Sequence, residues 1–496
     1  MRLVVLSVGL SCLAGCTGVG EYFHNGFKVG REYMRPAALV ADDWRDSGDS
    51  RLESGAAEGL RWWAVFQDPT LDHLIAIACQ QNITLREAGL RIVEAQEQRA
   101  VVAGTLFPQV QDAVGEFAHS QRSTKTATFR RSSSQIDSGN VGLREFSNWR
   151  LGGSLAWELD FWGRFRRAIE AADARLDSSI ENYDDALVLL IAEVATAYVD
   201  YRTVQQRLTF ARSNADLQRE STRIAEVRKS EDARDSEIDA PQAKSNLART
   251  LAGMEALEIA LRRHENRLAV LLGMPPHDSA YLLDGPQPVP VAPETVAIGV
   301  PAELLRRRPD VRRAERLVAA ANADIGVAEA NLYPRVMLNG ATAYEAAQFG
   351  DLFDAGAWSG SVGPSFRWNI LNYGRLLHSV QVQDARFQQQ VAAFEQTVLT
   401  ANEEAENAIT AFLHYHVQIK LLAQSVADAQ EAVRVAQAKY FEGQIDFNRV
   451  FTVQQLLTTQ QDQLATSQGN LALSLIELYR ALGGGWEIRL EPVSVE

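Results

Sequence analysis

The stretch Trp149–Arg164, WRLGGSLAWELDFWGR, contains two successive patterns that indicate the fold class. Up to Phe161 its apolar residues occupy every second position, with polar or small residues between them. This period of two is typical of a β-strand with one apolar face. Directly afterwards the period changes, because no Pro or Gly occurs from Arg164 to Lys229 and apolar residues recur every seven positions. The sequence therefore predicts a membrane-type strand followed by one very long helix.

The predicted helix from Gly163 to Lys229 would be about 100 Å long at 1.5 Å rise per residue. Its seam combines two heptad series, which begin at Leu176 and Ile180 and contain many alanines. A seven-residue apolar period predicts left-handed supercoiling of long packed helices. A break follows, and a second helical stretch then leads to Leu272 and Gly273. Together the two stretches predict a long antiparallel helical hairpin.

The same plan occurs twice. Trp157 and Gly163 recur as Trp368 and Gly374, about 210 residues later, and an alternating stretch again precedes a heptad helix. The fold class is therefore α+β, with four strands, two helical hairpins and an internal two-fold repeat. The predicted divisions are 1–15 (signal peptide), 16–60 (extended, lipid-anchored segment), 61–273 (first repeat, with strands near 107–161 and a hairpin at 163–273), 274–300 (Pro-rich linker), 301–484 (second repeat, with strands near 334–370 and a hairpin at 374–483) and 485–496 (tail).

The chain begins like a secreted lipoprotein. Arg2 precedes a short apolar run, which is typical of a signal peptide. The run ends in Leu13–Cys16, LAGC, which resembles the lipobox of bacterial lipoproteins and implies acylation at Cys16. The alternative is a coincidental cysteine after an ordinary signal. Because Thr17 follows instead of Asp, the resemblance favours outer-membrane sorting, with outer-membrane lipid as a partner.

Charge and motifs exclude several function classes. The net charge of -14 would repel phosphate backbones, so we expect no nucleic-acid partner. The sequence contains no HExxH, Walker or GxSxG motif, and His414 and His416 point to different helix faces. We therefore expect no catalytic residues, no metal and no cofactor, and the protein should not be an enzyme. Cys79 should be a small buried side chain.

Membrane crossing, if it occurs, has to use the strands, because no run of eighteen apolar residues exists. Four strands cannot close around a lumen, and open edges are not viable in lipid. Three copies would supply twelve strands, enough for a transmembrane β-barrel with an aqueous bore. Four tryptophans near the strand ends fit an aromatic belt at the membrane interface, or alternatively an ordinary core: Trp149, Trp157, Trp358 and Trp368.

Several motifs resemble a known family. They are Trp62–Pro69 (WWAVFQDP), Asn82 with Leu85, Trp157–Arg164 (WELDFWGR), Glu303–Glu315 (ELLRRRPDVRRAE) with Ala320–Gly326, and Tyr333 with Pro334. Together they resemble the outer-membrane efflux proteins of the TolC superfamily, in the NodT/OprM-like lipoprotein branch. The resemblance covers nearly the whole mature chain.

This resemblance implies a homotrimer in the outer membrane of a Gram-negative-type bacterium, whose twelve-stranded barrel continues into an α-helical periplasmic tunnel. It also implies a periplasmic adaptor protein and an inner-membrane RND-type pump as partners. The expected function is passive conduction of small toxic compounds to the exterior. The alternatives are an exit duct for type I secretion or polysaccharide export and, more remotely, a lipid-anchored coiled-coil scaffold without a pore.

The resemblance further implies a constriction at the tip of the second hairpin. Counted from Gly443, the positions that carry acidic rings in one branch of the family are Arg449 and Thr452 here. This departure puts an acidic ring in doubt. Asp446 lies close by at helical spacing from Arg449, so we expect Arg449 to help close the tip by pairing with an acidic neighbour. Asp235 and Asp239 at the first tip are further candidates, and all of these side chains could instead be solvated surface groups.

Overall fold

The computed structural model describes residues 18–38, 40–53, 61–123, 125, 145–231, 237–283, 285–299 and 301–490. The chain divides into two compact units. We call them the sheet unit (Met1–Arg35, Glu94–Leu176, Arg316–Val391) and the hairpin unit (Pro36–Val93, Asp177–Glu315, Ala392–Glu496). Each unit combines segments from both halves of the sequence, so the compact units cut across the two predicted repeats.

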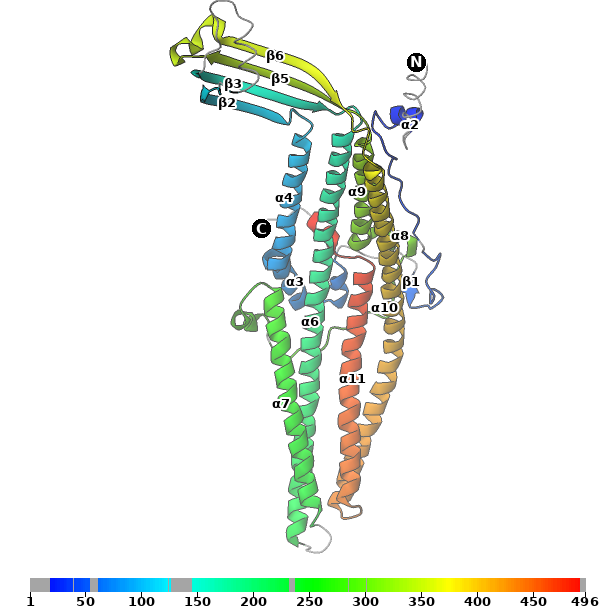
Figure 1. Ribbon diagram of the computed structural model, residues 1–496. Helices are drawn as coiled ribbons and strands as arrows, with labels where there is room; N and C mark the ends of the chain where they lie inside the picture. The colour runs from blue at the N-terminus through cyan, green and yellow to red at the C-terminus, as the bar shows by residue number, and fades with distance from the viewer. Residues whose placement is uncertain are drawn as a thin grey trace, which may run out of the picture. The chain divides into compact units, whose positions relative to one another are not determined.

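The sheet unit contains one antiparallel sheet of four strands in the order β2-β3-β5-β6 (Figure 1). The strands are β2 (Val110–Gln121), β3 (Glu145–Leu159), β5 (Arg335–Ala346) and β6 (Trp358–Arg367). They lie in the stretches where alternating hydrophobicity predicts strands. β2 and β6 form the two edges of this sheet, and they run in opposite directions because every neighbouring pair is antiparallel.

The register separates the sheet into an apolar and a polar face, because residues paired across neighbouring strands point to the same side. The apolar face carries Phe117, Trp149, Leu151, Leu155, Trp157, Leu338, Tyr344, Trp358, Val362 and Phe366. The polar face carries Asp112, Glu116, Arg150, Glu158, Arg335, Asn339, Glu345, Ser361, Ser365 and Arg367. On the polar face Arg150 and Glu345 form a cross-strand ion pair of 3.4 Å.

Most of two helical hairpins lies in the hairpin unit. The hairpins are built from α6 (Arg164–Glu231) with α7 (Asp239–Leu271), and from α10 (Arg375–Phe441) with α11 (Phe447–Ala481). Only the first residues of α6 and α10 belong to the sheet unit. α6 is one uninterrupted helix of 68 residues, as its composition predicts. Within the hairpin unit each long helix lies beside its partner (Figure 1). Small seam residues such as Ala401 and Ala408 are buried, which lets neighbouring helices approach closely.

The remaining elements complete the two units. They are α2 (Val19–His24), β1 (Leu52–Glu53), η1 (Trp62–Phe66), α3 (Pro69–Gln81), α4 (Ile83–Gly104), η2 (Pro276–Leu283), β4 (Val296–Ala297), α8 (Pro301–Arg307), α9 (Pro309–Ala330), η3 (Phe349–Phe353), η4 (Ala355–Ala357) and η5 (Trp486–Leu490). β1 pairs in parallel with β4. Among the helices of the described ranges, none combines the length and apolar character that crossing a bilayer requires.

The Trp62–Pro69 motif builds the core of the hairpin unit. Trp62 stacks on Tyr479 at 5.4 Å between ring centroids. Asp68 caps the start of α3 by accepting hydrogen bonds from the backbone amides of Thr70 and Leu71. Its second carboxylate oxygen accepts a hydrogen bond of 2.7 Å from the Tyr198 hydroxyl on α6. These motif residues therefore anchor α3 to the long helix.

The Glu303–Glu315 motif connects three helices of the hairpin unit through Arg308. Buried Arg308 donates to the Ala481 carbonyl at the end of α11 and pairs with Asp310 and Glu404, each at 2.8 Å. Burial disfavours its charge, yet the two carboxylates raise the pKa of Arg308 above its ordinary value. The guanidinium thus stays charged and joins the start of α9 to α10 and α11.

Candidate functional site

At the turn ends of the two hairpins, residues from four helices meet in one small apolar cluster. Its buried members are Ala225, Ala240, Ala243, Ala436, Tyr440, Phe447 and Val450. Gly443 permits the turn between α10 and α11, because its φ of 77° is a conformation that favours glycine. The cluster ties the end of the second hairpin to the end of the first.

Tyr440 makes the polar contacts of this cluster. Its hydroxyl donates a hydrogen bond of 3.0 Å to the Asp239 carboxylate at the start of α7. The Arg228 guanidinium on α6 donates to the Tyr440 carbonyl at 2.9 Å and lies 4.5 Å from the ring centroid. Burial, followed by the Asp239 contact, raises the pKa of the Tyr440 phenol above its ordinary value. The phenol therefore remains a hydrogen-bond donor. Tyr440 is thus held at its hydroxyl by Asp239 and at its carbonyl by Arg228, and we call these contacts the Tyr440 lock.

The residues predicted to close the tip of the second hairpin lie at the start of α11. Asp446 is the N-cap of α11, since its carboxylate accepts a hydrogen bond of 3.1 Å from the Arg449 backbone amide. The contact between these two residues is thus a helix cap, and the Arg449 side chain is exposed. Thr452 is exposed and donates to the Asn448 carbonyl at 2.8 Å. Asp235, like Cys16, lies outside the described residues.

Buried polar side chains join the hairpins above the apolar cluster. Ser221 on α6 accepts hydrogen bonds from Gln454 at 2.8 Å and from Gln437 at 3.1 Å. Farther along, Asn214 donates to Gln461 at 2.8 Å. Each such pair costs stability if it is broken, because a buried polar group is then left without a partner. The pairs therefore fix the register of one hairpin against the other.

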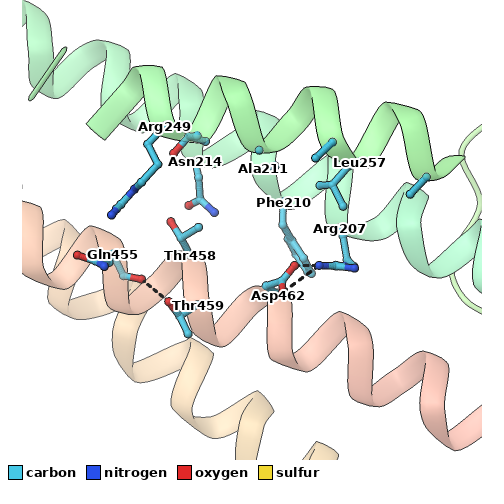
Figure 2. Close-up of a pocket in the computed structure, with 14 residues that line it drawn as sticks. Arg207, Phe210, Ala211, Asn214, Arg249, Leu257, Gln455, Thr458, Thr459 and Asp462 are labelled. Atoms are coloured by element: carbon cyan, nitrogen blue, oxygen red, sulfur yellow. Dashed lines mark hydrogen bonds and ion pairs between the residues drawn. The ribbon is translucent and has the colours of Figure 1, made fainter. Parts of the chain in front are cut away.

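A groove of about 580 Å³ runs beside these pairs, between α6, α7 and α11 (Figure 2). An ion pair between Arg207 and Asp462, with contacts of 2.7 and 3.2 Å, crosses it from one hairpin to the other. Arg249 and Thr458 also line the groove. Its mixed lining and its ion pair make it part of the seam between the hairpins.

The four predicted interface tryptophans occupy two levels of the sheet. The register places Trp149 and Trp358 toward one end of the strands. Trp157 and Trp368 lie toward the other end, where their indole N–H groups donate to the carbonyls of Leu106 and Leu332 at 3.1 and 2.9 Å. Rings with one satisfied polar atom and an apolar body suit a boundary between water and lipid.

Two observations on the described part of the chain concern metal and thiol chemistry. There, no group of three or more His, Cys, Asp or Glu side chains is arranged to hold a metal ion. Burial raises the pKa of the Cys79 thiol to about 11, so this thiol is a poor nucleophile at neutral pH.

Comparison with known proteins shows similar sequences and a similar solved structure over nearly the whole chain. A family model described as outer membrane efflux protein matches residues 74–274 and 300–484. Outer membrane protein OprJ of Pseudomonas aeruginosa is 30% identical over 458 residues, covering 92% of each chain. The pyoverdine export outer membrane protein OpmQ of Pseudomonas putida is 31% identical, covering 90% of this chain and 92% of its own. The solved outer-membrane channel OprN superposes with a TM-score of 0.85 at 31% identity, covering 92% of this chain and 99% of that one.

Proposed function

Because the chain belongs to the outer membrane efflux protein family and is an outer-membrane component of an efflux pump, we propose that three copies form one continuous exit duct. Their sheets close into a twelve-stranded barrel in the outer membrane, and their hairpins form a periplasmic tunnel. Transport through the duct is passive, and the energy comes from an inner-membrane RND-type pump acting through a periplasmic adaptor. The two halves of the chain are an internal two-fold repeat.

The sheet is the observation that carries this proposal. Its edges, β2 and β6, run in opposite directions, so β6 of one copy can pair antiparallel with β2 of the next. Closure by cyclic symmetry removes both open edges, which lipid does not tolerate. The apolar face would then contact lipid and the polar face would line an aqueous bore. Strands in both alternating stretches also count against the pore-free scaffold.

The hairpin ends are the proposed gate. A permanently open bore would breach the outer membrane, so the resting duct needs a closed end. The Tyr440 contacts with Asp239 and Arg228 support closure here, because they hold the second hairpin against the first. We further propose that Arg449 pairs with an acidic neighbour when three copies converge. Asp446 and Thr452 belong to the same end of α11, and Asp235 is a further candidate from its position in the sequence.

The substrate class is small and chemically varied. OpmQ is described as a pyoverdine export protein and another relative, TtgF, as a toluene efflux component, and these compounds have no common recognition chemistry. We propose that this duct likewise conducts small molecules and that its pump selects them. An exit duct for secreted proteins or polysaccharide remains the second candidate. We also propose that acylated Cys16 anchors the segment 16–60 in the outer membrane.

The gate proposal is tested by the single-channel conductance of Arg449→Ala in planar bilayers. Loss of the guanidinium should raise the resting conductance, because one closing contact per copy is removed. Arg434→Ala is the control, since Arg434 is also exposed but pairs with Glu431 on its own helix. Resting conductance equal to that of the wild type would remove Arg449 from the gate.

A further inference from the structure

An aromatic cluster follows the predicted anchor within a few residues. Tyr22, Phe23 and Phe27 pack edge to face on one another, with ring centroids 5.3–5.8 Å apart. The Tyr22 ring also contacts Trp162, directly after Phe161. Three side chains in this region are more than half exposed: Phe23 at 60%, Phe27 at 52% and Phe161 at 54%. We call these three the aromatic patch.

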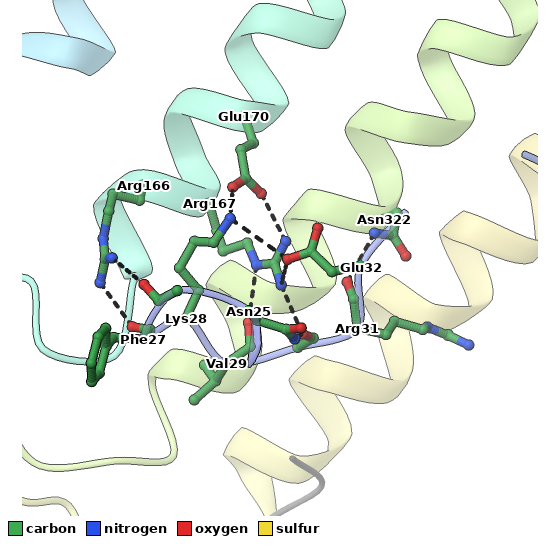
Figure 3. Close-up of polar contacts among 12 residues, drawn as sticks. Asn25, Phe27, Lys28, Val29, Arg31, Glu32, Arg166, Arg167, Glu170 and Asn322 are labelled. Carbon is green, nitrogen blue, oxygen red and sulfur yellow. Dashed lines mark hydrogen bonds and ion pairs between the residues drawn. The ribbon is translucent and has the colours of Figure 1, made fainter. Parts of the chain in front are cut away.

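Several hydrogen bonds fix the patch on the sheet unit. The Tyr22 hydroxyl donates to the Phe161 carbonyl at 2.7 Å. Arg166 at the start of α6 donates to the carbonyls of Gly26 and Phe27 at 2.7 and 2.8 Å (Figure 3). Its guanidinium is itself held by Asp160 at 3.0 Å. The exposed rings therefore lie on a turn whose backbone is held by these hydrogen bonds.

The segment after the patch is held even more firmly. The guanidinium of Arg167, which is almost fully buried, donates to the carbonyls of Val29 and Gly30 at 3.0 and 2.7 Å (Figure 3). It also pairs with Glu170 at 2.8 Å, and Lys28 contacts the same carboxylate. At Gly30 an added Cβ would lie 2.8 Å from the Gly326 Cα, so the segment runs against α9 without room for a side chain.

Phe27 has a left-handed backbone conformation in the turn after α2. Its φ of 63° is unfavourable for a bulky residue and easy for glycine. The contacts of the turn hold it there, since the Phe27 amide donates to the Tyr22 carbonyl at 2.9 Å and Arg166 donates to the Phe27 carbonyl. Half of the Phe27 side chain nevertheless stays exposed, so the turn keeps an apolar ring at the surface.

The patch lies at a defined level of the sheet. Phe161 comes two residues after the end of β3. Trp162 stacks on Tyr333 at 4.6 Å and donates to the Pro334 carbonyl at 2.8 Å, directly before β5. The patch is therefore at the same end of the strands as Trp157 and Trp368, and it continues the proposed aromatic belt along the chain's N-terminal segment.

From this placement we infer that Phe23, Phe27 and Phe161 insert into the boundary between headgroups and acyl chains of the adjacent lipid leaflet. The inference rests on the proposed function, since it requires the sheet to span the membrane. Outer-membrane barrels carry girdles of aromatic residues at that depth, and Phe is among the residues that interfacial segments turn toward lipid. Cys16 lies within about 25 Å of Phe23 along an extended chain, so the acyl anchor can reach the same leaflet. The occupant of the patch is thus the lipid surface.

Site-directed nitroxide labelling tests this depth in the full chain carrying Cys12→Ser, Cys16→Ser and Cys79→Ser. Labels are placed at Phe23→Cys and Phe27→Cys, so that each variant carries a single thiol. Met34→Cys is the matched control, since Met34 is 83% exposed in the same segment beyond the Arg167 contacts. The protein is reconstituted in phosphatidylethanolamine and phosphatidylglycerol vesicles, and label accessibility to oxygen and to a water-soluble nickel chelate is measured.

The expected result is high oxygen and low nickel accessibility at positions 23 and 27, with the reverse at position 34. Nickel accessibility at all three positions, in vesicles that show conductance, would overturn the lipid contact and leave the duct intact. Exclusion of both reagents at positions 23 and 27 would also overturn it, because the patch would then be covered by another copy. Failure of the protein to enter vesicles at all would overturn the proposed duct itself.

Discussion

Tyr440 shows how one side chain can hold the proposed gate. Removing its hydroxyl in Tyr440→Phe keeps the ring in the apolar cluster and leaves Asp239 without its partner. We expect a loss of about 1 kcal/mol at the hairpin ends and a higher resting conductance in planar bilayers. Tyr415→Phe is the control, because it makes the same change elsewhere on α10. Equal resting conductance in Tyr440→Phe and the control would contradict this role.

The Tyr440 lock should also be insensitive to pH over the physiological range. Its phenol pKa is raised above the ordinary value of 10.0, so the folded state favours the protonated, donating form. That stabilisation is fully present below pH 10 and is lost only as the pH rises through the raised pKa. The difference in resting conductance between the wild type and Tyr440→Phe should therefore stay constant between about pH 5 and pH 9. A step in the wild type within this range that Tyr440→Phe abolishes would contradict the assignment.

Asp446 combines two roles that substitutions can separate. Asp446→Ala removes the cap of α11 and should cost about 1 kcal/mol, which corresponds to roughly fivefold faster amide exchange in the first turn of the helix. Asp446→Asn keeps a capping oxygen without the charge, so exchange should stay near the wild-type rate. A conductance in Asp446→Asn that differs from the wild type would then report the effect of the charge, because this variant keeps the cap. Exchange at the wild-type rate in Asp446→Ala would show that the cap does not stabilise the first turn of α11.

At the scale of elements, the sheet faces make the sharpest prediction. Val362 is 78% exposed on the apolar face of β6, and its neighbour Ser361 is on the polar face. Val362→Arg should cost about 2–4 kcal/mol in a bilayer and reduce the yield of assembled protein on unheated SDS gels. Ser361→Arg, the matched control, should assemble normally and shift the ion selectivity of the bore. Equal assembly of the two variants would argue against lipid contact on the apolar face.

Strands and long helices could be predicted from the sequence because each buries one face. The alternation around Trp157 and the heptads of α6 are local signals of that burial. The Tyr440 lock and the Arg166 contacts could not be predicted in this way, since their partners lie far away in the chain. A tyrosine at a heptad seam position just before Gly443 was the available signal, because a buried phenol requires a partner. The sequence offers Asp446 as a charged neighbour of Arg449, but in the structure its carboxylate caps α11 through the Arg449 backbone amide.

At the scale of the whole molecule, the two sequence repeats do not correspond to two compact units. The order β2, β3, α6, α7 is followed by β5, β6, α10, α11, yet the strands of both halves pair in one sheet. Arg308 likewise joins the start of α9 to the second hairpin. Each compact unit is therefore built from segments of both halves of the sequence.

The central claim is that three copies close a membrane duct. It is tested most directly by reconstituting the purified full chain into planar bilayers while its native mass is measured in detergent. We expect discrete conductance steps from a particle of three chains, each of 54.8 kDa before processing. A monomer without conductance would contradict the closed barrel and favour a pore-free scaffold.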